Sequence, residues 1–222
     1  MSSQPLTISL GQATDKGKKA INQDFHGLLA PQEPLLTSKG IAMAIADGIS
    51  SSDVSQIASA SSVKGFLNDY FATSEAWSVK SSVKRVLHSL NSWLYAQSRS
   101  GPDRFNMDKG YVCTFSAMIF KSSTAFLFHV GDTRVYRLTN HSLEQLTTDH
   151  RQQISVDKSY LSKALGMRDQ LEFDYQQFGL DIGDTFILMT DGVYEYVKQT
   201  FISETIHQQH DDLDTAARLI ID

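Results

Sequence analysis

The sequence predicts one α+β domain, because a helical stretch is followed by a run of short strands. Apolar residues recur at helical spacing in two consecutive stretches, at about 54–72 and 76–98. From Tyr111 onward the pattern changes to short apolar runs separated by turn residues, which is typical of antiparallel strands. With 222 residues, 41% of them hydrophobic, the chain is long enough to bury one core.

The first part of the chain is predicted to hold a strand, a basic turn and a loop. Residues 6–10 alternate weakly and are expected to form the strand. Several lysines follow, and the last of them, Lys19, closely precedes Asp24. A cation near a carboxylate suits a phosphate held beside a metal, although a solvated basic turn is the simpler interpretation. Residues 31–39 are expected to be a loop.

Two apolar strands are each expected to end in an Asp-Gly pair. Residues 41–46 form an apolar run of the length of a buried strand, and Asp47 and Gly48 follow it directly. The same arrangement returns at 185–192, where Asp191 is the acid. A glycine at such a place lets the backbone approach a ligand closely, whereas the simpler interpretation of each pair is a turn.

The two predicted helices form an antiparallel pair joined by a short link at about 73–75. Asp53 is a plausible N-cap of the first helix. Its inward residues are expected to be Ile57, Ala60, Val63, Leu67 and Tyr70. Those of the second helix are expected to be Val79, Val83, Val86, Leu90 and either Trp93 or Leu94.

The second half of the chain is predicted to be a meander of strands with a helix at the end. The expected strands are 111–120, 124–130, 134–138, 143–146, 171–178 and the Asp-Gly strand from 185. Between them, 149–161 is expected to be irregular and 161–166 to be a short helical turn. Residues 213–221 are expected to be a helix.

Acidic residues stand at several predicted strand ends. Asp132 follows Gly131 after an apolar strand and makes a third candidate beside Asp47 and Asp191. Glu195 lies one helical turn beyond Asp191 if the chain is helical there. Carboxylates held on rigid strands are the ligands that a hard divalent cation requires. The residues alone therefore leave a metal site and a set of ordinary turns as open alternatives.

Composition and single residues exclude several classes of protein. The formal net charge is −5 and no long basic run is present, which argues against nucleic acid and anionic membranes as partners. The N-terminus resembles no secretory signal, and no stretch has the apolar length of a membrane span, so we expect a soluble, cytoplasmic protein. Cys113 is expected to be a buried, inert thiol, and His129 a packed strand residue.

Several motifs, in order along almost the whole chain, resemble those of the metal-dependent protein Ser/Thr phosphatases of the type 2C class (the PPM family) in their bacterial form. The matching segments are N-Q-D at 22–24, A-D-G at 46–48, a loose G-Y-V-C-T at 110–114, H-V-G-D-T-R-V-Y at 129–136, L-S-K-A-L-G at 161–166 and T-D-G-V-Y-E at 190–195.

The resemblance implies a four-layer α-β-β-α sandwich of two antiparallel sheets flanked by helices. It also implies two manganese or magnesium ions, with room for a third, weaker ion. Carried over by position, Asp47 would bridge both ions, the Gly48 carbonyl would bind one, Asp191 would bind the other, and Asp24 would hold water bound to the metal. The third ion would lie at Asp132, Asp191 and Glu195, and Lys19 falls where the family usually has a phosphate-binding arginine.

The implied reaction is hydrolysis of phosphoserine or phosphothreonine in proteins by a metal-activated water, with no covalent intermediate. Cys113 lacks the Cys-x5-Arg neighbourhood of a cysteine phosphatase. The implied partners are phosphorylated proteins and a protein kinase, fused to this chain or separate. A metal-dependent nuclease is a second class, but the acidic composition argues against it.

The sequence departs from the family pattern at four places. Lys19 offers a point charge in place of a bidentate arginine, Gln23 stands where an acid is frequent, and the segment 149–161 is shorter than the usual flap. The Asp-Asn pair that supplies a final metal ligand is absent from the sequence. Two accounts are open: residues 1–222 are a phosphatase domain that lacks its last strand, or they are a weakly catalytic pseudophosphatase that binds phosphoproteins.

Overall fold

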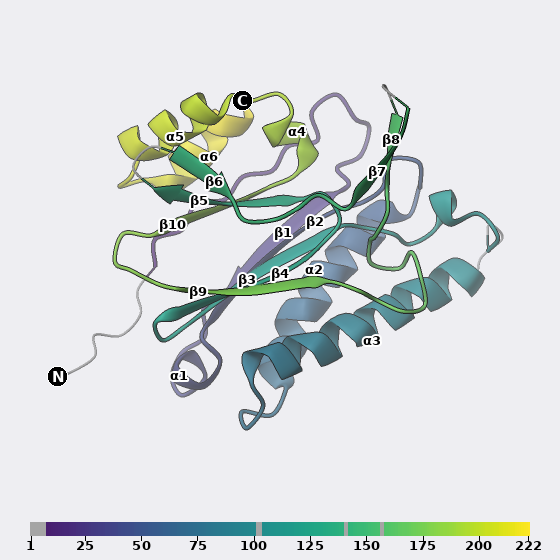
Figure 1. Ribbon diagram of the computed structural model, residues 1–222, viewed down its shortest axis with the longest axis horizontal. Coiled ribbons are helices and arrows are strands. Elements are labelled where there is room, and N and C mark those ends of the chain that lie inside the picture. Colours follow the sequence, from purple (N-terminus) through teal and green to yellow (C-terminus); the bar gives the residue numbers. More distant parts are fainter. Residues whose placement is uncertain (1–7, 101–103, 140–141, 156–157) are drawn as a thin grey trace.

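The computed structural model describes residues 8–100, 104–139, 142–155 and 158–222. Two antiparallel sheets pack face to face, and helices cover the outer face of each sheet (Figure 1). Each sheet turns one face to the other sheet and buries its second face under helices, which gives four layers. The predicted α+β sandwich is therefore confirmed.

The larger sheet has five strands in the order β1-β2-β3-β4-β9. They are β1 (Asp24–Leu29), β2 (Ile41–Asp47), β3 (Phe115–Lys121), β4 (Thr124–Val130) and β9 (Asp174–Gly179). The helices α2 (Ser55–Ala72) and α3 (Val79–Ser100) lie across its outer face (Figure 1). Phe66 of α2 meets Phe115 of β3 edge to face at a centroid distance of 5.2 Å, which joins the helix layer to the sheet.

The smaller sheet has three strands in the order β10-β5-β6. They are β5 (Arg134–Thr139), β6 (Ser142–Gln145) and β10 (Thr185–Met189). The helices α5 (Gln199–Gln208) and α6 (Leu213–Ile221) cover it through an apolar cluster that includes Tyr136, Ile202 and Ile220. A second cluster, with Met118 and Leu127 from the larger sheet and Val135 from β5, packs between the sheets.

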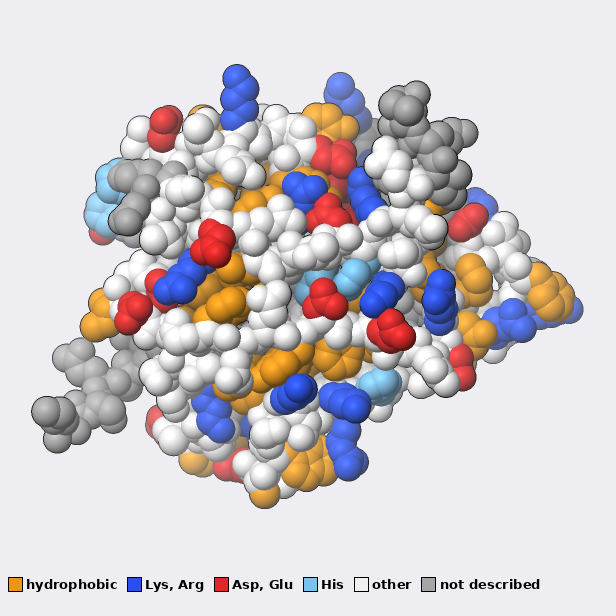
Figure 2. Space-filling model, viewed as in Figure 1, with side chains coloured by type: hydrophobic (Ala, Val, Ile, Leu, Met, Phe, Trp, Pro, Cys, Tyr) orange, Lys and Arg blue, Asp and Glu red, His pale blue; other side chains and the backbone are white. Residues whose placement is uncertain are grey.

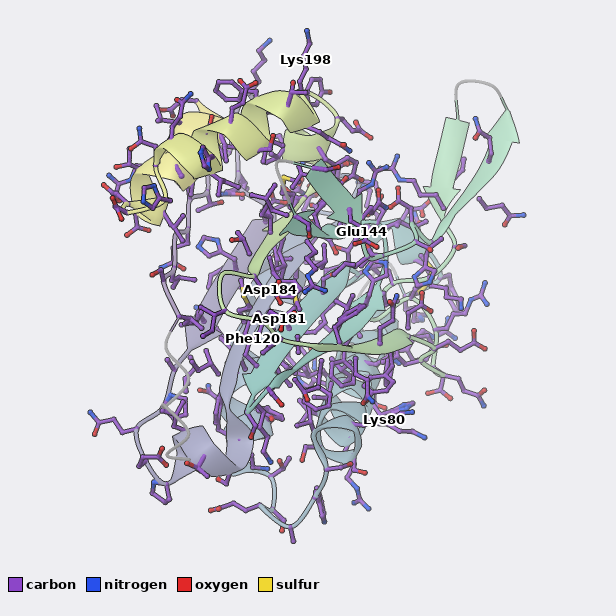
Figure 3. The ribbon with its side chains drawn as sticks, turned by 60° about the vertical axis from the view of Figure 1, so that its left-hand side comes forward. Lys80, Phe120, Glu144, Asp181, Asp184 and Lys198 are labelled. Carbon is purple, nitrogen blue, oxygen red and sulfur yellow. The ribbon has the colours of Figure 1, made fainter. Side chains whose placement is uncertain are left out.

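Short elements connect these layers. They are α1 (Leu35–Lys39), the 3-10 helix Met107–Lys109, the hairpin of β7 (Arg151–Ser155) and β8 (Lys158–Leu161), and α4 (Asp191–Tyr194). The turn at 181–184 lies beside Phe120 of β3 (Figure 3), and the Phe120 ring contacts that of Phe186 at 5.5 Å. These contacts close one end of the sandwich.

The first half of the chain differs from the sequence prediction at its beginning and at its helix faces. From Ile8 the segment expected to be a strand is extended without strand pairing, and residues 6–7 lie outside the described part. The segment expected to be only a loop contains α1. Val54 is the N-cap of α2, so the predicted cap at Asp53 is wrong. In α3 it is Leu94 that faces inward, while Trp93 is partly exposed.

The inward face of α2 is the predicted one in part: Val63, Leu67 and Tyr70 are buried as expected, whereas Ala60 is half-buried. Ile57 is 44% exposed, whereas the small residues Ser55, Ala58, Ser59 and Ser62 are buried. Their size lets the helix approach the sheet closely, and Ser59 Oγ donates to the Gln23 carbonyl at 2.6 Å. A periodicity that counts only apolar residues missed Ser55, Ser59 and Ser62, because serine is polar.

The second half contains a hairpin and a helix that the sequence did not predict. Residues expected to be irregular form the β7–β8 hairpin, and α5 was not anticipated. The turn at 161–166 is not helical, because Leu165 makes a β-bridge with Cys113. β3 begins at Phe115, four residues later than expected, because the preceding segment pairs as isolated bridges.

Candidate active site

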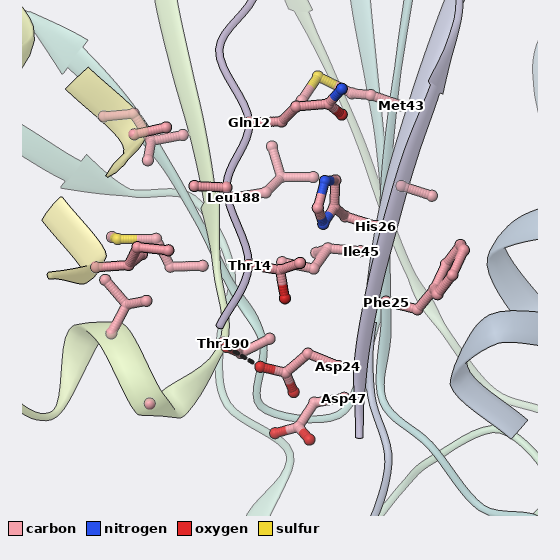
Figure 4. Close-up of a pocket in the computed structure, with 18 of the residues that line it drawn as sticks. Gln12, Thr14, Asp24, Phe25, His26, Met43, Ile45, Asp47, Leu188 and Thr190 are labelled. Atoms are coloured by element: carbon pink, nitrogen blue, oxygen red, sulfur yellow. Dashed lines mark hydrogen bonds between the residues drawn. The ribbon is translucent and has the colours of Figure 1, made fainter. Parts of the chain in front are cut away.

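Asp24 and Asp47 lie next to each other because of strand register. β1 and β2 are antiparallel neighbours, and their register places Asp24 opposite Asp47. Both side chains therefore lie at the same end of the larger sheet, where Figure 4 shows the two carboxylates side by side. Asp24 and Asp47 are thus separated in the sequence but are brought together by the pairing of two antiparallel strands.

Asp47 is held in place by its backbone and has an unpaired side-chain oxygen. Thr114 Oγ1 accepts a hydrogen bond from the Asp47 N–H at 2.9 Å, and Thr114 N donates to the Asp47 carbonyl at 2.8 Å. The Oδ1 atom of Asp47 is buried and has no hydrogen-bond partner. Burial and the neighbouring Asp24 raise the pKa of Asp47 well above its usual value.

Asp191 reaches this pair from the smaller sheet. It is the first residue of α4, directly after β10, and its charge contributes to the raised pKa of Asp47. Thr190 joins the two sheets here, because its Oγ1 donates to Asp24 Oδ2 at 2.9 Å (Figure 4). Asp24, Asp47 and Asp191 are the inner acids of the site. The sequence analysis did not anticipate the role of Thr190.

Gly48 and Lys19 complete the inner part of the site. A Cβ atom at Gly48 would lie 2.6 Å from the Ser55 carbonyl oxygen, so only glycine fits between β2 and the start of α2. Lys19 N donates to the Lys16 carbonyl at 3.1 Å in the turn before β1. Lys19 lines the same cavity as the inner acids, and its charge acts against the rise in the pKa of Asp47.

The side chain of Gln23 makes structural hydrogen bonds and is not a free group of the site. Its Nε2 atom donates to Ser55 Oγ at 2.8 Å and to the Ser52 carbonyl at 3.2 Å. The amide therefore fastens the loop after Gly48 to β1. A carboxylate at this position could not donate these hydrogen bonds.

Two further carboxylates, those of Asp132 and Glu195, meet Asp191 around Arg151 beside the inner acids. Arg151 contacts Asp132 at 2.5 Å, and Asp191 and Glu195 at 3.4 Å each. Asp132, Asp191 and Glu195 are the outer acids, and Asp191 belongs to both groups. The structure thus brings together the residues expected to hold a third ion. Arg151 was not predicted to be a site residue, because nothing in its local sequence points toward acids so distant along the chain.

His129 and Cys113 are packed residues. His129 is 1% exposed, its Nδ1 atom pairs with Ser116 Oγ at 2.8 Å, and burial lowers its pKa to about 4. Burial likewise raises the pKa of the Cys113 thiol to about 12, so the reactive thiolate is not formed at neutral pH. Both side chains are therefore neutral components of the core, as the sequence predicted.

The inner acids suit divalent cations that keep water in their coordination shell. The buried, unpaired Asp47 Oδ1 lies beside a second carboxylate, which is an arrangement that a cation would stabilise. In the described part of the chain, no three His, Cys, Asp or Glu side chains are close enough to hold a metal by themselves. Magnesium commonly uses one or two carboxylates and several waters, so the donors present fit such an ion.

The acids open into a large cavity between the two sheets. This cavity has a volume of about 1940 Å³, and its wall includes Met43, Ile45 and Leu188 beyond the carboxylates (Figure 4). The extended segment that carries Gln12 and Thr14 runs along it (Figure 4). The site is thus polar at the ends of the strands and apolar farther in.

Comparison with known proteins identifies relatives over nearly the whole chain. The family described as "Protein phosphatase 2C" matches residues 14–218. A serine/threonine phosphatase named stp from Listeria monocytogenes serotype 4b (strain F2365) is 28% identical over 215 residues, which cover 87% of this chain and 81% of the relative.

Solved structures show the same fold at lower identity. Serine/threonine phosphatase Stp1 from Staphylococcus aureus superposes with a TM-score of 0.74 and 19% identity, over 99% of this chain and 93% of that one. The serine/threonine phosphatase PstP/Ppp of Mycobacterium tuberculosis gives a TM-score of 0.72 and 21% identity, over 91% and 85% of the two chains.

Proposed function

This chain belongs to the protein phosphatase 2C family, and from that premise we propose that it is a metal-dependent protein serine/threonine phosphatase. Its substrates are phosphoserine and phosphothreonine in other proteins. The observation that carries the proposal is the adjacent pair of Asp24 and Asp47, with a buried, unpaired oxygen on Asp47, which lines the cavity together with Asp191.

Two manganese or magnesium ions, when bound, would activate a water for in-line attack on phosphorus and neutralise the phosphate oxygens. We assign Asp47, the Gly48 carbonyl and Asp191 to holding these ions. Asp24 would orient the waters around them, and its own carboxylate is oriented by Thr190. Lys19 would attract the phosphate as a point charge, since its ammonium group cannot form the bidentate fork of an arginine.

The protein needs no covalent nucleophile for this reaction. The thiol of Cys113 is fully buried and bonded to Ser62, so it cannot reach a substrate. A catalytically weak pseudophosphatase that binds phosphoproteins was the alternative from sequence, and no observation on the described residues favours it.

The domain assignment rests on the free edge of β10. Within the described part, β10 pairs with β5 alone, and its residues Phe186, Ile187 and Leu188 are only half-buried. An edge of unpaired backbone groups beside an apolar cavity is a place for another strand. We therefore propose that residues 1–222 form one phosphatase domain whose smaller sheet is completed by one further strand along β10.

The partners follow from the proposed substrate. Phosphorylated proteins are the expected ligands, and a protein kinase, fused or separate, would produce them. The face in Figure 2 carries basic and acidic side chains intermixed, which supports the prediction that nucleic acid is not a partner. No helix in the described ranges is long and apolar enough to cross a membrane. The cytoplasmic location stays a prediction.

The test is hydrolysis of a phosphothreonine peptide by the full-length protein with Mn²⁺ and with EDTA. We expect turnover that requires Mn²⁺ and is lost in Asp47→Asn. Asp69→Asn is the matched control, because it makes the same change at an exposed position of α2. Mn²⁺-independent turnover, or equal turnover in Asp47→Asn and the wild type, would contradict the proposal. Absence of turnover in every form would favour the binding role.

A further inference from the structure

The outer acids already hold a cation that belongs to the protein. Each contact with Arg151 uses a different nitrogen: Nε to Asp132 Oδ2 at 2.5 Å, the NH2 group to Asp191 Oδ2 at 3.4 Å, and the NH1 group to Glu195 Oε1 at 3.4 Å. A guanidinium is a planar fork of five N–H donors that stays protonated at every physiological pH. One side chain thus faces three carboxylates at once.

The backbone directly before Arg151 is fastened to the turn that carries Asp132. His150 N donates to the Gly131 carbonyl at 2.7 Å, and Gly131 N donates back to His150 Nδ1 at 3.1 Å. Ser162 N donates to the His150 carbonyl at 2.8 Å, which joins β8 to the same point. Arg151 is the first residue of β7, so its side chain starts from a fixed position next to the outer acids.

Asp132 is fixed from the opposite side as well. Its carbonyl accepts a hydrogen bond from Tyr194 OH at 2.9 Å, and its side chain is only 7% exposed. Tyr194 is part of α4, the helix that begins at Asp191. The three carboxylates therefore lie around one guanidinium, and Asp132 depends on it most, because its side chain is buried while those of Asp191 and Glu195 are 37% and 40% exposed.

The inner and outer acids differ in whether a positive group of the protein pairs with their negative charge. The inner Asp47 has a buried oxygen with no partner, whereas each outer acid has a guanidinium nitrogen. A divalent ion among the outer acids would be repelled by the guanidinium and would have to break its short bond to Asp132.

We propose that Arg151 is a tethered cation that takes the place of a third divalent ion, so that this phosphatase binds two ions and not three. The proposal rests on the proposed function, because the two ions are those of the inner acids. Arg151 is a positioning residue: it touches neither substrate nor the reacting water, but it neutralises Asp132 and Glu195 and holds the β7–β8 hairpin against α4.

The experiment counts bound manganese per chain, by native mass spectrometry and by calorimetric titration, in the wild type and in Arg151→Gln. We expect two ions in the wild type and one additional, weaker ion in Arg151→Gln. Arg137→Gln is the matched control, because it removes a guanidinium of similar exposure that pairs with Asp184, outside both groups of acids. It should bind two ions.

A second variant locates the additional ion. Arg151→Gln combined with Glu195→Gln should return to two ions, because one of the three outer carboxylates is then neutral. Three ions in the wild type would overturn the inference, and this count remains decisive even if Arg151→Gln does not fold. Equal numbers in the wild type and Arg151→Gln, or an additional ion that persists in the double variant, would also overturn it. A wild type that binds no manganese would overturn the proposed function itself, which is a distinct result.

Discussion

The inner and outer acids lie side by side and carry the same kind of side chain, yet they differ in the positive group that pairs with them. Asp47 has a buried oxygen without a partner and a raised pKa, because of its burial and the second carboxylate beside it. Burial also raises the pKa of Asp132, but the hydrogen bond from Arg151 opposes this rise. Neighbouring carboxylates can therefore be balanced differently: Asp132 is bonded to a cation of the protein, whereas Asp47 keeps an unpaired oxygen that a bound cation would stabilise.

The largest expected effect distinguishes the inner from the outer acids when one carboxylate in each group is replaced by the corresponding amide. Asp47→Asn should lower kcat/KM at least about 10³-fold, equivalent to ~4 kcal/mol of transition-state stabilisation, because it removes the residue that would join both ions. Glu195→Gln should lower it less than about threefold, since an exposed ion pair contributes little. Steady-state kinetics with Mn²⁺ measures both. Similar losses in the two variants would remove the distinction between inner and outer acids.

The next effect concerns the stability of the metal-free protein. The folded-state pKa of Asp47 is raised, so between the usual carboxyl range and that higher pKa the folded protein keeps a proton that the unfolded chain has lost. The free energy of unfolding contributed by Asp47 therefore falls as the pH rises through this window. Thermal melts in EDTA should show a larger decrease in Tm from pH 5 to pH 7.5 for the wild type than for Asp47→Asn.

Added Mn²⁺ should cancel this decrease in the wild type, because the ion would stabilise the ionised carboxylates. Asp69→Asn should behave like the wild type in both conditions. An identical pH dependence for the wild type and Asp47→Asn without metal would show that Asp47 is not held at a raised pKa.

A smaller effect tests the link between the two sheets. Thr190→Val keeps the shape of the side chain and removes the hydroxyl that donates to Asp24. We expect about a tenfold decrease in kcat, or ~1.4 kcal/mol, because Asp24 loses one orienting hydrogen bond. Thr185→Val, on the strand β10 that precedes Thr190, is the control and should change kcat little. If both variants behave alike, Thr190 does not orient the inner acids.

The smallest effect concerns the lysine in the turn before β1. Lys19→Ala should raise KM for a phosphopeptide by about two- to fivefold, corresponding to about 0.2–1 kcal/mol, with kcat nearly unchanged, because its exposed charge is screened by solvent. Lys19→Arg should lower KM, since a guanidinium can bind phosphate through two donors. Lys16→Ala is the control for loss of charge in the same turn. A large decrease in kcat for Lys19→Ala would give the lysine a role beyond attraction.

The sequence by itself determined the fold class, the strand Ile41–Asp47 and the identity of most acids in the site. These features depend on local patterns: an apolar run of strand length, Asp-Gly pairs at strand ends, and motifs in a fixed order. β4 and α6 were predicted with their observed limits for the same reason, since periodicity and turn residues act within a few positions.

The tertiary structure alone decided which acids are paired with a cation of the protein and which keep an unpaired oxygen. Thr190 meets Asp24 across 166 residues, and Arg151 meets Glu195 across 44, so no local pattern could indicate either contact. The outward position of Ile57 has a similar cause, because packing on the sheet turned the small residues Ala58 and Ser59 inward beside it. Charge pairing and close packing depend on which distant groups the folded chain brings together, so a local sequence pattern does not indicate them.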